Sequence, residues 1–241
     1  MANFNTHFTV AAGASAIVSS TLLSMEILAP QEAISAFFLG TLGGLLPDVD
    51  SAHSTSIKVG FNVLSFLATI MLIFLKVHSY SLVEIFIMSI IVFTTIRYLF
   101  LGIFRKISKH RGMFHSIPVA IIWGILIASF VHVSFGLNSL VSWIYGLVIT
   151  IGYIVHLTLD ELYSVDLENA RMKKSFGTAF KFFNFKTTFS TIQTLLIYAS
   201  IPLLLQIAPD SSLFIHTIFS HESWLTFKEI IIPYDGKWFL H

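Results

Sequence analysis

The sequence predicts an all-α protein built as a bundle of membrane-spanning helices. Of its 241 residues, 55% are hydrophobic and only 11% are charged, and the mean hydropathy is +0.82. Soluble domains usually carry about 25% charged residues, so this composition indicates an integral membrane protein. The apolar residues gather into about seven long segments that are separated by polar stretches. We therefore expect a polytopic membrane helix bundle.

Charge and cysteine content narrow the classes of function. The net charge is +1, whereas nucleic-acid-binding proteins carry clustered basic surface, so no contact with nucleic acid is expected. The chain has no cysteine, which excludes disulfides and cysteine-ligated zinc. Any metal must then be bound by histidine, carboxylate or water. Residues Met1–Phe8 lack a basic stretch and a small-residue cleavage site, so no cleaved signal peptide is expected.

The apolar segments define the expected helices. A helix needs about 20 largely apolar residues to cross the hydrocarbon core. The second segment has about 14 residues, which is short for a crossing, so it either re-enters the membrane or continues through Pro47. The seven segments are Phe8–Leu28, Ala33–Leu46, Ile57–Leu75, Leu82–Ile103, Ile117–Phe135, Ser139–Leu159 and Phe189–Ile207.

Two domains follow from this division. Residues 1–207 form the bundle, and residues 208–241 form a C-terminal tail. In the tail, the run Ser223–Ile232 suits either a helix in the outer membrane interface or an ordinary segment packed on the bundle.

Basic residues predict the orientation. Four lie in the loop after the fourth segment and five in the loop after the sixth, so these two loops hold nine of the 14 basic residues. Two crossings separate the loops, so they share a side, which the positive-inside rule makes cytoplasmic. The N-terminus is then cytoplasmic and the C-terminus outside. The same count places one set of polar residues at cytoplasmic helix ends: His7, Asp48, Asp50, His53, His110, His115, His156 and Asp160.

The pair His156 and Asp160 is the first candidate site. At a spacing of four residues on a helix, both side chains point to the same face. Neutral imidazole and carboxylate are good ligands for zinc, manganese or iron. The alternative is structural: a histidine whose ring nitrogens are hydrogen-bonded, next to a residue that caps the helix end, would give the same sequence pattern. Ionisable groups near the bilayer are costly and usually functional, which favours the metal site.

A second candidate site follows Pro47. Asp48 and Asp50 can reach a shared cation from an extended stretch, and His53 lies in the polar run after them. A solvated loop that caps the next helix would look alike.

The third polar cluster surrounds Gly112. A turn there can bring His110 and His115 together, and the planar guanidinium of Arg111 matches a phosphate or carboxylate. A basic cytoplasmic loop that happens to contain histidines is the alternative. His7, just before the first segment, has the weakest individual case and gains weight only from its position at the same membrane side.

Taken in order, these motifs resemble a known family. An early histidine, Leu-Pro-Asp-x-Asp, His-Arg-Gly-x-x-His-Ser and His-Leu-x-Leu-Asp over residues 7–160 are similar to the YdjM-like family of membrane-bound, metal-dependent hydrolases. That family is also described as LexA-binding and inner-membrane-associated, with a distant similarity to zinc-dependent phospholipase C and the P1-type nucleases. The resemblance implies a helical core of that kind in a bacterial inner membrane. It also implies metal ligands at His7, Asp48, Asp50, His110, His115, His156 and Asp160.

The resulting hypothesis is a metal-dependent hydrolase at the cytoplasmic membrane face, acting on a lipid phosphoester or another membrane-associated substrate. Zinc is favoured, with manganese, iron or magnesium as alternatives, and more than one ion is expected. Asp48 or Asp50 would bridge metals or accept a proton, while Arg111 with Lys173 and Lys174 would bind the phosphoester. Two other classes stay open: an ion or metal transporter, and a non-catalytic structural or regulatory membrane protein.

Overall fold

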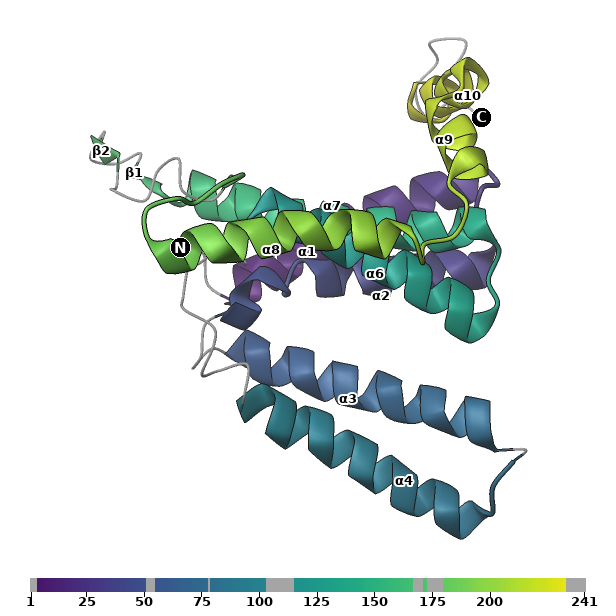
Figure 1. Cartoon of the computed structure of the whole chain (residues 1–241). Coiled ribbons are helices and arrows are strands. Elements are labelled where there is room, and N and C mark those ends of the chain that lie inside the picture. Colours follow the sequence, from purple (N-terminus) through teal and green to yellow (C-terminus); the bar gives the residue numbers. More distant parts are fainter. Residues whose placement is uncertain are drawn as a thin grey trace. The chain divides into compact units, whose positions relative to one another are not determined.

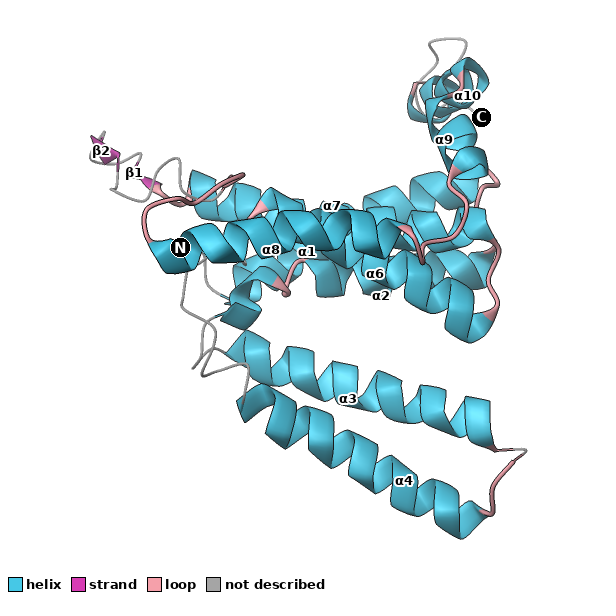
Figure 2. Ribbon diagram, in the orientation of Figure 1, coloured by secondary structure: helices cyan, strands magenta, loops and turns pink. Residues whose placement is uncertain are grey.

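The structure is a computed structural model of the chain, and it describes residues 4–50, 55–77, 79–102, 115–166, 171–172 and 180–232. Most of the described residues are helical (Figure 2), so the predicted all-α class is confirmed. A two-residue antiparallel pair of strands, β1 (Val165–Asp166) and β2 (Arg171–Met172), is the exception. The helices, labelled in Figure 1, are α1 (Phe4–Ser24), α2 (Pro30–Gly43), η1 (Pro47–Asp50), α3 (Thr55–Lys76), α4 (Leu82–Thr94), η2 (Thr95–Phe100), α6 (Ile117–Phe135), α7 (Ser139–Leu162), α8 (Thr188–Leu205), α9 (Ser212–Phe219) and α10 (His221–Ile231).

Within the described ranges, five helices are long and apolar enough to cross a membrane. Seven crossing segments were expected, so that number is not confirmed. Helix α2 has 14 residues, about 21 Å of helix at 1.5 Å per residue, against a hydrocarbon core of about 30 Å. The five candidate spans are Phe4–Ser24, Leu82–Phe100, Ile117–Phe135, Ser139–Leu162 and Thr188–Leu205.

Two expected boundaries were wrong. Helix α1 begins at Phe4, so His7 lies inside its first two turns rather than before the helix. The apolar stretch marks what lies in the lipid, whereas backbone hydrogen bonding decides where a helix begins. The second segment was expected at Ala33–Leu46, but helix α2 runs from Pro30 to Gly43. Pro47 opens the separate 3₁₀ turn η1, so of the two alternatives the helix that continues through Pro47 is ruled out.

The chain divides into two compact units. The first contains residues Met1–His7, Leu45–Val119 and His156–Ile197, and the second contains Phe8–Gly44, Ala120–Val155 and Tyr198–His241. In the first unit, α3 and α4 pack against each other as an antiparallel hairpin (Figure 1). Phe61 of α3 and Leu101, just beyond η2, are buried together, with Ile96 packed against them.

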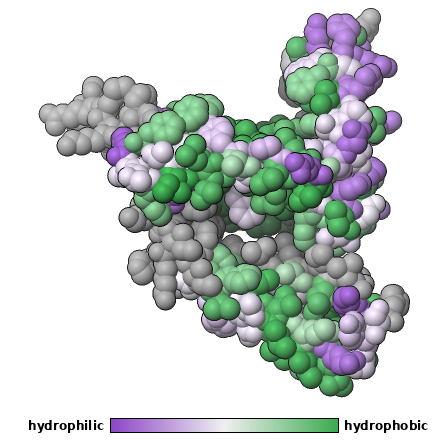
Figure 3. Space-filling view, viewed as in Figure 1, coloured by the Kyte–Doolittle hydropathy of each residue, from purple (hydrophilic) through white to green (hydrophobic). Residues whose placement is uncertain are grey.

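The outer surface of the α3–α4 hairpin is largely apolar. Hydrophobic side chains cover much of its visible face, and hydrophilic ones gather towards its turn (Figure 3). Helix α4 continues as the π-helix η2, where the Arg97 guanidinium lies 5.4 Å from the centre of the Tyr98 ring. Such a surface suits contact with lipid chains.

In the second unit, small residues let the helices approach closely. Gly40 of α2 lies against Ser15 of α1, and Gly152 of α7 lies against the backbone of Gly40. Gly44, at the end of α2, faces Ala11 of α1. Because the later residue of α2 meets the earlier residue of α1, these two helices run antiparallel. Small residues at helix interfaces are typical of membrane bundles, where van der Waals packing replaces the hydrophobic effect.

Aliphatic side chains fill the rest of this core. Buried residues from α1, α2, α6 and α7 meet in one cluster, with Ile144 and Val148 of α7 fully buried within it. At the beginning of α7, the Trp143 indole N–H donates to the Pro209 carbonyl at 2.9 Å, and its ring stacks on Phe214 of α9. The connection from α8 to α9 is therefore fastened to α7.

The substitution Gly152→Ala should destabilise the second unit. A Cβ at this position would overlap the Gly40 carbonyl, and backbone cannot yield as a flexible side chain can. Overpacking of this kind typically costs about 1–3 kcal/mol. We expect a lower melting temperature in detergent, followed by tryptophan fluorescence.

Gly13→Ala is the matched control, because a Cβ at Gly13 of α1 meets no atom within 4 Å. Alanine is the better helix former by about 1 kcal/mol, so this variant should melt at the same temperature as the unmodified protein or higher. Equal losses in both variants would contradict the close approach of α2 and α7.

Candidate metal centre

Five of the residues singled out from the sequence come together in the first unit. Asp160 lies near the end of α7 with His156 one turn earlier, and His7 lies near the beginning of α1. His115 lies two residues before α6, and Asp48 lies in η1. Each of the five residues therefore lies in a helix near its end or within two residues of a helix. We call these five residues the His–Asp cluster.

Asp160 is the centre of the cluster. The Nε2–H of His115 donates to Asp160 Oδ2 at 2.9 Å, and His156 Nε2 lies 3.9 Å from the same oxygen. His7 Nε2 lies 3.4 Å from Oδ1. All four side chains are at least 97% buried. The carboxylate is thus surrounded by three imidazoles, and all four side chains are almost fully buried.

His156 connects Asp160 to Asp48. Its ring stacks on the His7 ring at 3.6 Å between centroids and 12° between planes, and it meets the His115 ring edge-on at 5.3 Å. Its Nε2 lies 3.4 Å from Asp48 Oδ1. Three imidazoles and two carboxylates therefore share one small volume.

The ionisation of Asp48 favours its role as an anionic ligand or proton acceptor. Burial raises the pKa of this carboxyl, but the hydrogen bond to His156 and the charges of His156 and His7 outweigh burial. The pKa of Asp48 therefore lies below its usual range. Asp48 is a carboxylate at neutral pH.

The cluster leaves polar atoms without partners. Among the described residues, both ring nitrogens of His7, Nδ1 of His115 and Oδ1 of Asp160 are buried and make no hydrogen bond. Buried polar atoms are nearly always hydrogen-bonded, and an exception calls for an explanation such as an ion. One ligand atom each from His7, His156 and Asp160 lies within 4.8 Å of the others.

This donor set fits a divalent metal. Two ligand atoms about 2.1 Å from a tetrahedral ion lie about 3.4 Å apart, which is the distance between His7 Nε2 and Asp160 Oδ1. Imidazole and carboxylate suit zinc, manganese and iron alike, so the residues do not select one ion. His115, already bonded to Asp160, would hold that ligand in place as partners outside the coordination sphere commonly do.

The other predicted site residues fall outside the part of the chain whose side chains the structure describes. Asp50 belongs to η1 by its backbone, and its side chain is outside the described part. His53, His110, Arg111, Lys173 and Lys174 all lie outside the described residues. Their assigned roles stay predictions.

The sequence reasoning missed one segment beside the cluster. The Ile117 N–H donates to the Lys181 carbonyl at 3.2 Å, and Ser116 pairs with Lys181 in a parallel bridge. Residues Phe180–Lys186 therefore lie next to the backbone that carries His115. The missed signal was five phenylalanines within the ten residues 180–189.

A comparison with known protein families matches the part of the chain that contains the His–Asp cluster. Residues 1–169 match the model of the YdjM inner membrane protein family. The chain belongs to this family. Neither a curated protein nor a solved structure matches this chain. All five cluster residues lie inside the part matched by the YdjM family, and the segment Phe180–Lys186 lies outside it. Family membership and the apolar helices together identify an integral membrane protein.

Asp48→Asn should remove a stabilising contribution that depends on pH. A carboxyl with a lowered folded-state pKa stabilises the fold above its unfolded pKa of about 3.9, and this contribution is lost as the pH falls through the folded pKa. In the presence of a chelator, the unmodified protein should melt above the variant at pH 5, and the gap should shrink below about pH 4. Tryptophan fluorescence in detergent measures both. A gap that widens as the pH falls would contradict this electrostatic environment.

Proposed function

We propose that this YdjM-family protein is a membrane-embedded, metal-dependent hydrolase that acts on a phosphoester of a lipid or another membrane-associated substrate. The observation that supports it most is the His–Asp cluster, in which ligand atoms of His7, His156 and Asp160 converge while buried. The two helices that carry these ligands, α1 and α7, are both long and apolar enough to span the membrane. Burying such groups is costly, so a function is the natural reason to keep them.

His7, His156 and Asp160 would hold one divalent ion; zinc is the ion that the family resemblance favours, and manganese or iron would also fit these ligands. Asp48 is adjacent and could serve a second ion, together with Asp50 and His110 from the family resemblance. A divalent metal, when bound, lowers the pKa of a coordinated water to about 7 and polarises a phosphoryl oxygen.

The protein's own groups would divide the remaining work. Asp48, ionised and less buried than the other four, is suited to accept a proton from the attacking water. The hydrogen bond from His115 fixes the direction of the Asp160 carboxylate. Arg111, Lys173 and Lys174 would neutralise the phosphoester, since a guanidinium matches two phosphate oxygens.

The substrate class follows from access. The cluster lies near the ends of α1 and α7, where lipids arrive by lateral diffusion at headgroup depth. The distribution of basic residues would make this surface cytoplasmic, with the N-terminus on the same side and the C-terminus outside. A lipid phosphoester is therefore the preferred substrate.

A transporter is the main competitor, and one observation weakens it. An ion pathway needs polar groups through the middle of the membrane. In the described part of the second unit, the buried hydroxyls of Thr41, Ser129 and Ser142 each donate to a carbonyl four residues earlier in the chain. Hydroxyls used in this way satisfy the backbone and do not need an ion. Among the described residues of this unit, the buried Ser19 hydroxyl of α1 is the exception, because it makes no hydrogen bond. A non-catalytic structural role predicts that no metal binds at all.

His156→Ala should abolish both metal binding and hydrolysis. The variant removes one of three converging ligands, while the apolar spans that hold the protein in the membrane are unchanged. Elemental mass spectrometry of the detergent-purified protein should give at least one equivalent of zinc, manganese or iron in the unmodified protein and less than a tenth of that in the variant. A screen of phospholipids for released phosphate or headgroup then measures activity.

His216→Ala is the matched control, because His216 is an exposed histidine on α9 and does not belong to the unit that contains the cluster. It should keep full metal content and activity. An active His156→Ala variant would remove His156 from the ligands. No metal in the unmodified protein, even after divalent ions are added back, would favour the structural role instead.

A further inference from the structure

The segment Phe180–Lys186 presents a cluster of exposed aromatic rings. Phe180, Phe182, Phe183 and Phe185 are between 38% and 62% exposed. The Phe183 ring stacks on the Phe185 ring with 5.9 Å between their centroids, and the centroid of the Phe182 ring lies 6.4 Å from that of Phe183. Contiguous exposed apolar surface of this kind marks an interaction site rather than a packing defect.

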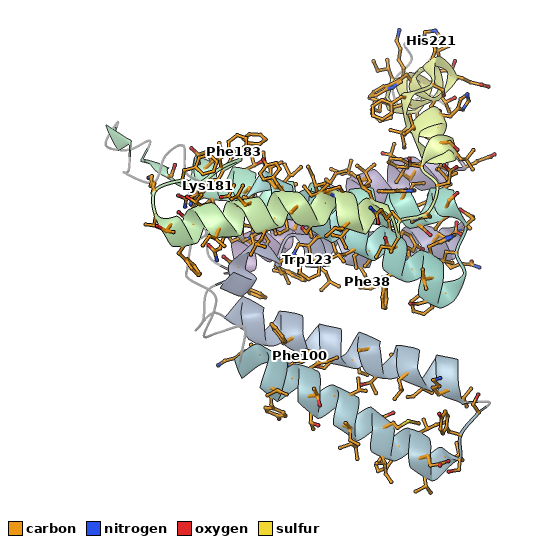
Figure 4. All side chains as sticks on the ribbon, viewed as in Figure 1. Phe38, Phe100, Trp123, Lys181, Phe183 and His221 are labelled. Atoms are coloured by element: carbon orange, nitrogen blue, oxygen red, sulfur yellow. The ribbon has the colours of Figure 1, made fainter. Side chains whose placement is uncertain are left out.

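Two lysines are interleaved with these rings. Lys181 is half-buried and Lys186 is exposed. No acidic residue lies between Phe180 and Phe189, so the segment carries net positive charge. Figure 4 shows Lys181 and Phe183 near each other, close to the beginning of α8. Aromatic rings next to lysines suit the boundary between acyl chains and anionic headgroups.

The segment is held in place at three points. At its beginning, the Lys181 carbonyl accepts from the Ile117 N–H. In its middle, the Asn184 N–H donates to the hydroxyl of Thr194, and that hydroxyl lies 3.2 Å from the Asn184 carbonyl. At its end, Thr187 and Ser190 bond to each other's backbone and cap α8. The rings are therefore presented by fixed backbone, which lowers the entropic cost of binding.

Its position fits a membrane surface. The segment directly precedes α8, a candidate span that begins at Thr188. It is bonded to Ser116 and Ile117, at the beginning of the candidate span α6. The next residue back is His115 of the His–Asp cluster. The rings and lysines thus lie where two spans enter the membrane, beside the candidate metal ligands.

We propose that Phe180–Lys186 is a lipid-docking segment that binds anionic phospholipid at the membrane surface next to the His–Asp cluster. The phenylalanines insert among the upper acyl chains, and Lys181 and Lys186 bind the headgroup phosphate. The lipid contact stands by itself, and only the delivery of that lipid to the cluster rests on the proposed hydrolase function.

A fluorescent label at position 183 tests the contact without any enzyme assay. The chain has no cysteine, so Phe183→Cys creates a unique site for bimane. The labelled full-length protein is placed in nanodiscs of phosphatidylglycerol and phosphatidylcholine, with bromine on the acyl chains of one lipid at a time. We expect brominated lipid to quench the label, with phosphatidylglycerol at least twofold more effective than phosphatidylcholine at equal mole fraction and low salt.

Lysine variants test the headgroup contact. Lys181→Gln with Lys186→Gln keeps the backbone bond of Lys181 and should make the two lipids quench equally. Lys228→Gln is the matched control, because Lys228 lies on α10, and it should keep the preference. A label that neither lipid quenches, or equal quenching before the lysines are changed, would overturn the proposal. Because no step needs catalysis, a failed hydrolysis assay leaves this result unaffected.

Discussion

The Asp160 carboxylate is buried near the end of a membrane helix, where a charged group is stable only when polar partners surround it. Its partners come from three separate parts of the sequence: His7, His115 and His156. The beginning of α1, the beginning of α6 and the end of α7 must therefore meet at one place. Removing one partner would leave the buried charge less fully compensated by the two that remain, which is destabilising.

The short helix α2 lies in the part of the chain that returns from α1 to the cluster. Helix α1 leaves the cluster at His7, and the chain returns to it at Asp48, which lies 3.4 Å from His156. The return uses only 14 helical residues, in antiparallel contact with α1 through Gly40 and Gly44. Small residues at these positions let the helices pack closely. Helices α1 and α7 each contribute residues to both units.

Much of this arrangement could be predicted from the sequence. Hydropathy located α6 to the residue, because its apolar stretch is bounded by Ser116 and by Gly136. The spacing of His156 and Asp160 placed both on one helix face, as the structure has them. Hydropathy failed where a helix extends beyond its apolar stretch, so it missed the beginning of α1, which carries His7. It also gave no sign of the π-helix at Arg97. It also could not show that His115 and Asp48 meet α7, because such contacts depend on tertiary packing.

The central claim is that the His–Asp cluster binds a divalent cation through imidazole nitrogen and carboxylate oxygen. Zinc K-edge X-ray absorption of the zinc-loaded protein tests it most directly. The account predicts a first shell of nitrogen and oxygen at about 2.0–2.1 Å, with the outer-shell scattering of at least two imidazoles. The imidazole signal should fall in His7→Ala and persist in His216→Ala. A shell of oxygen alone, or a spectrum unchanged by His7→Ala, would contradict it.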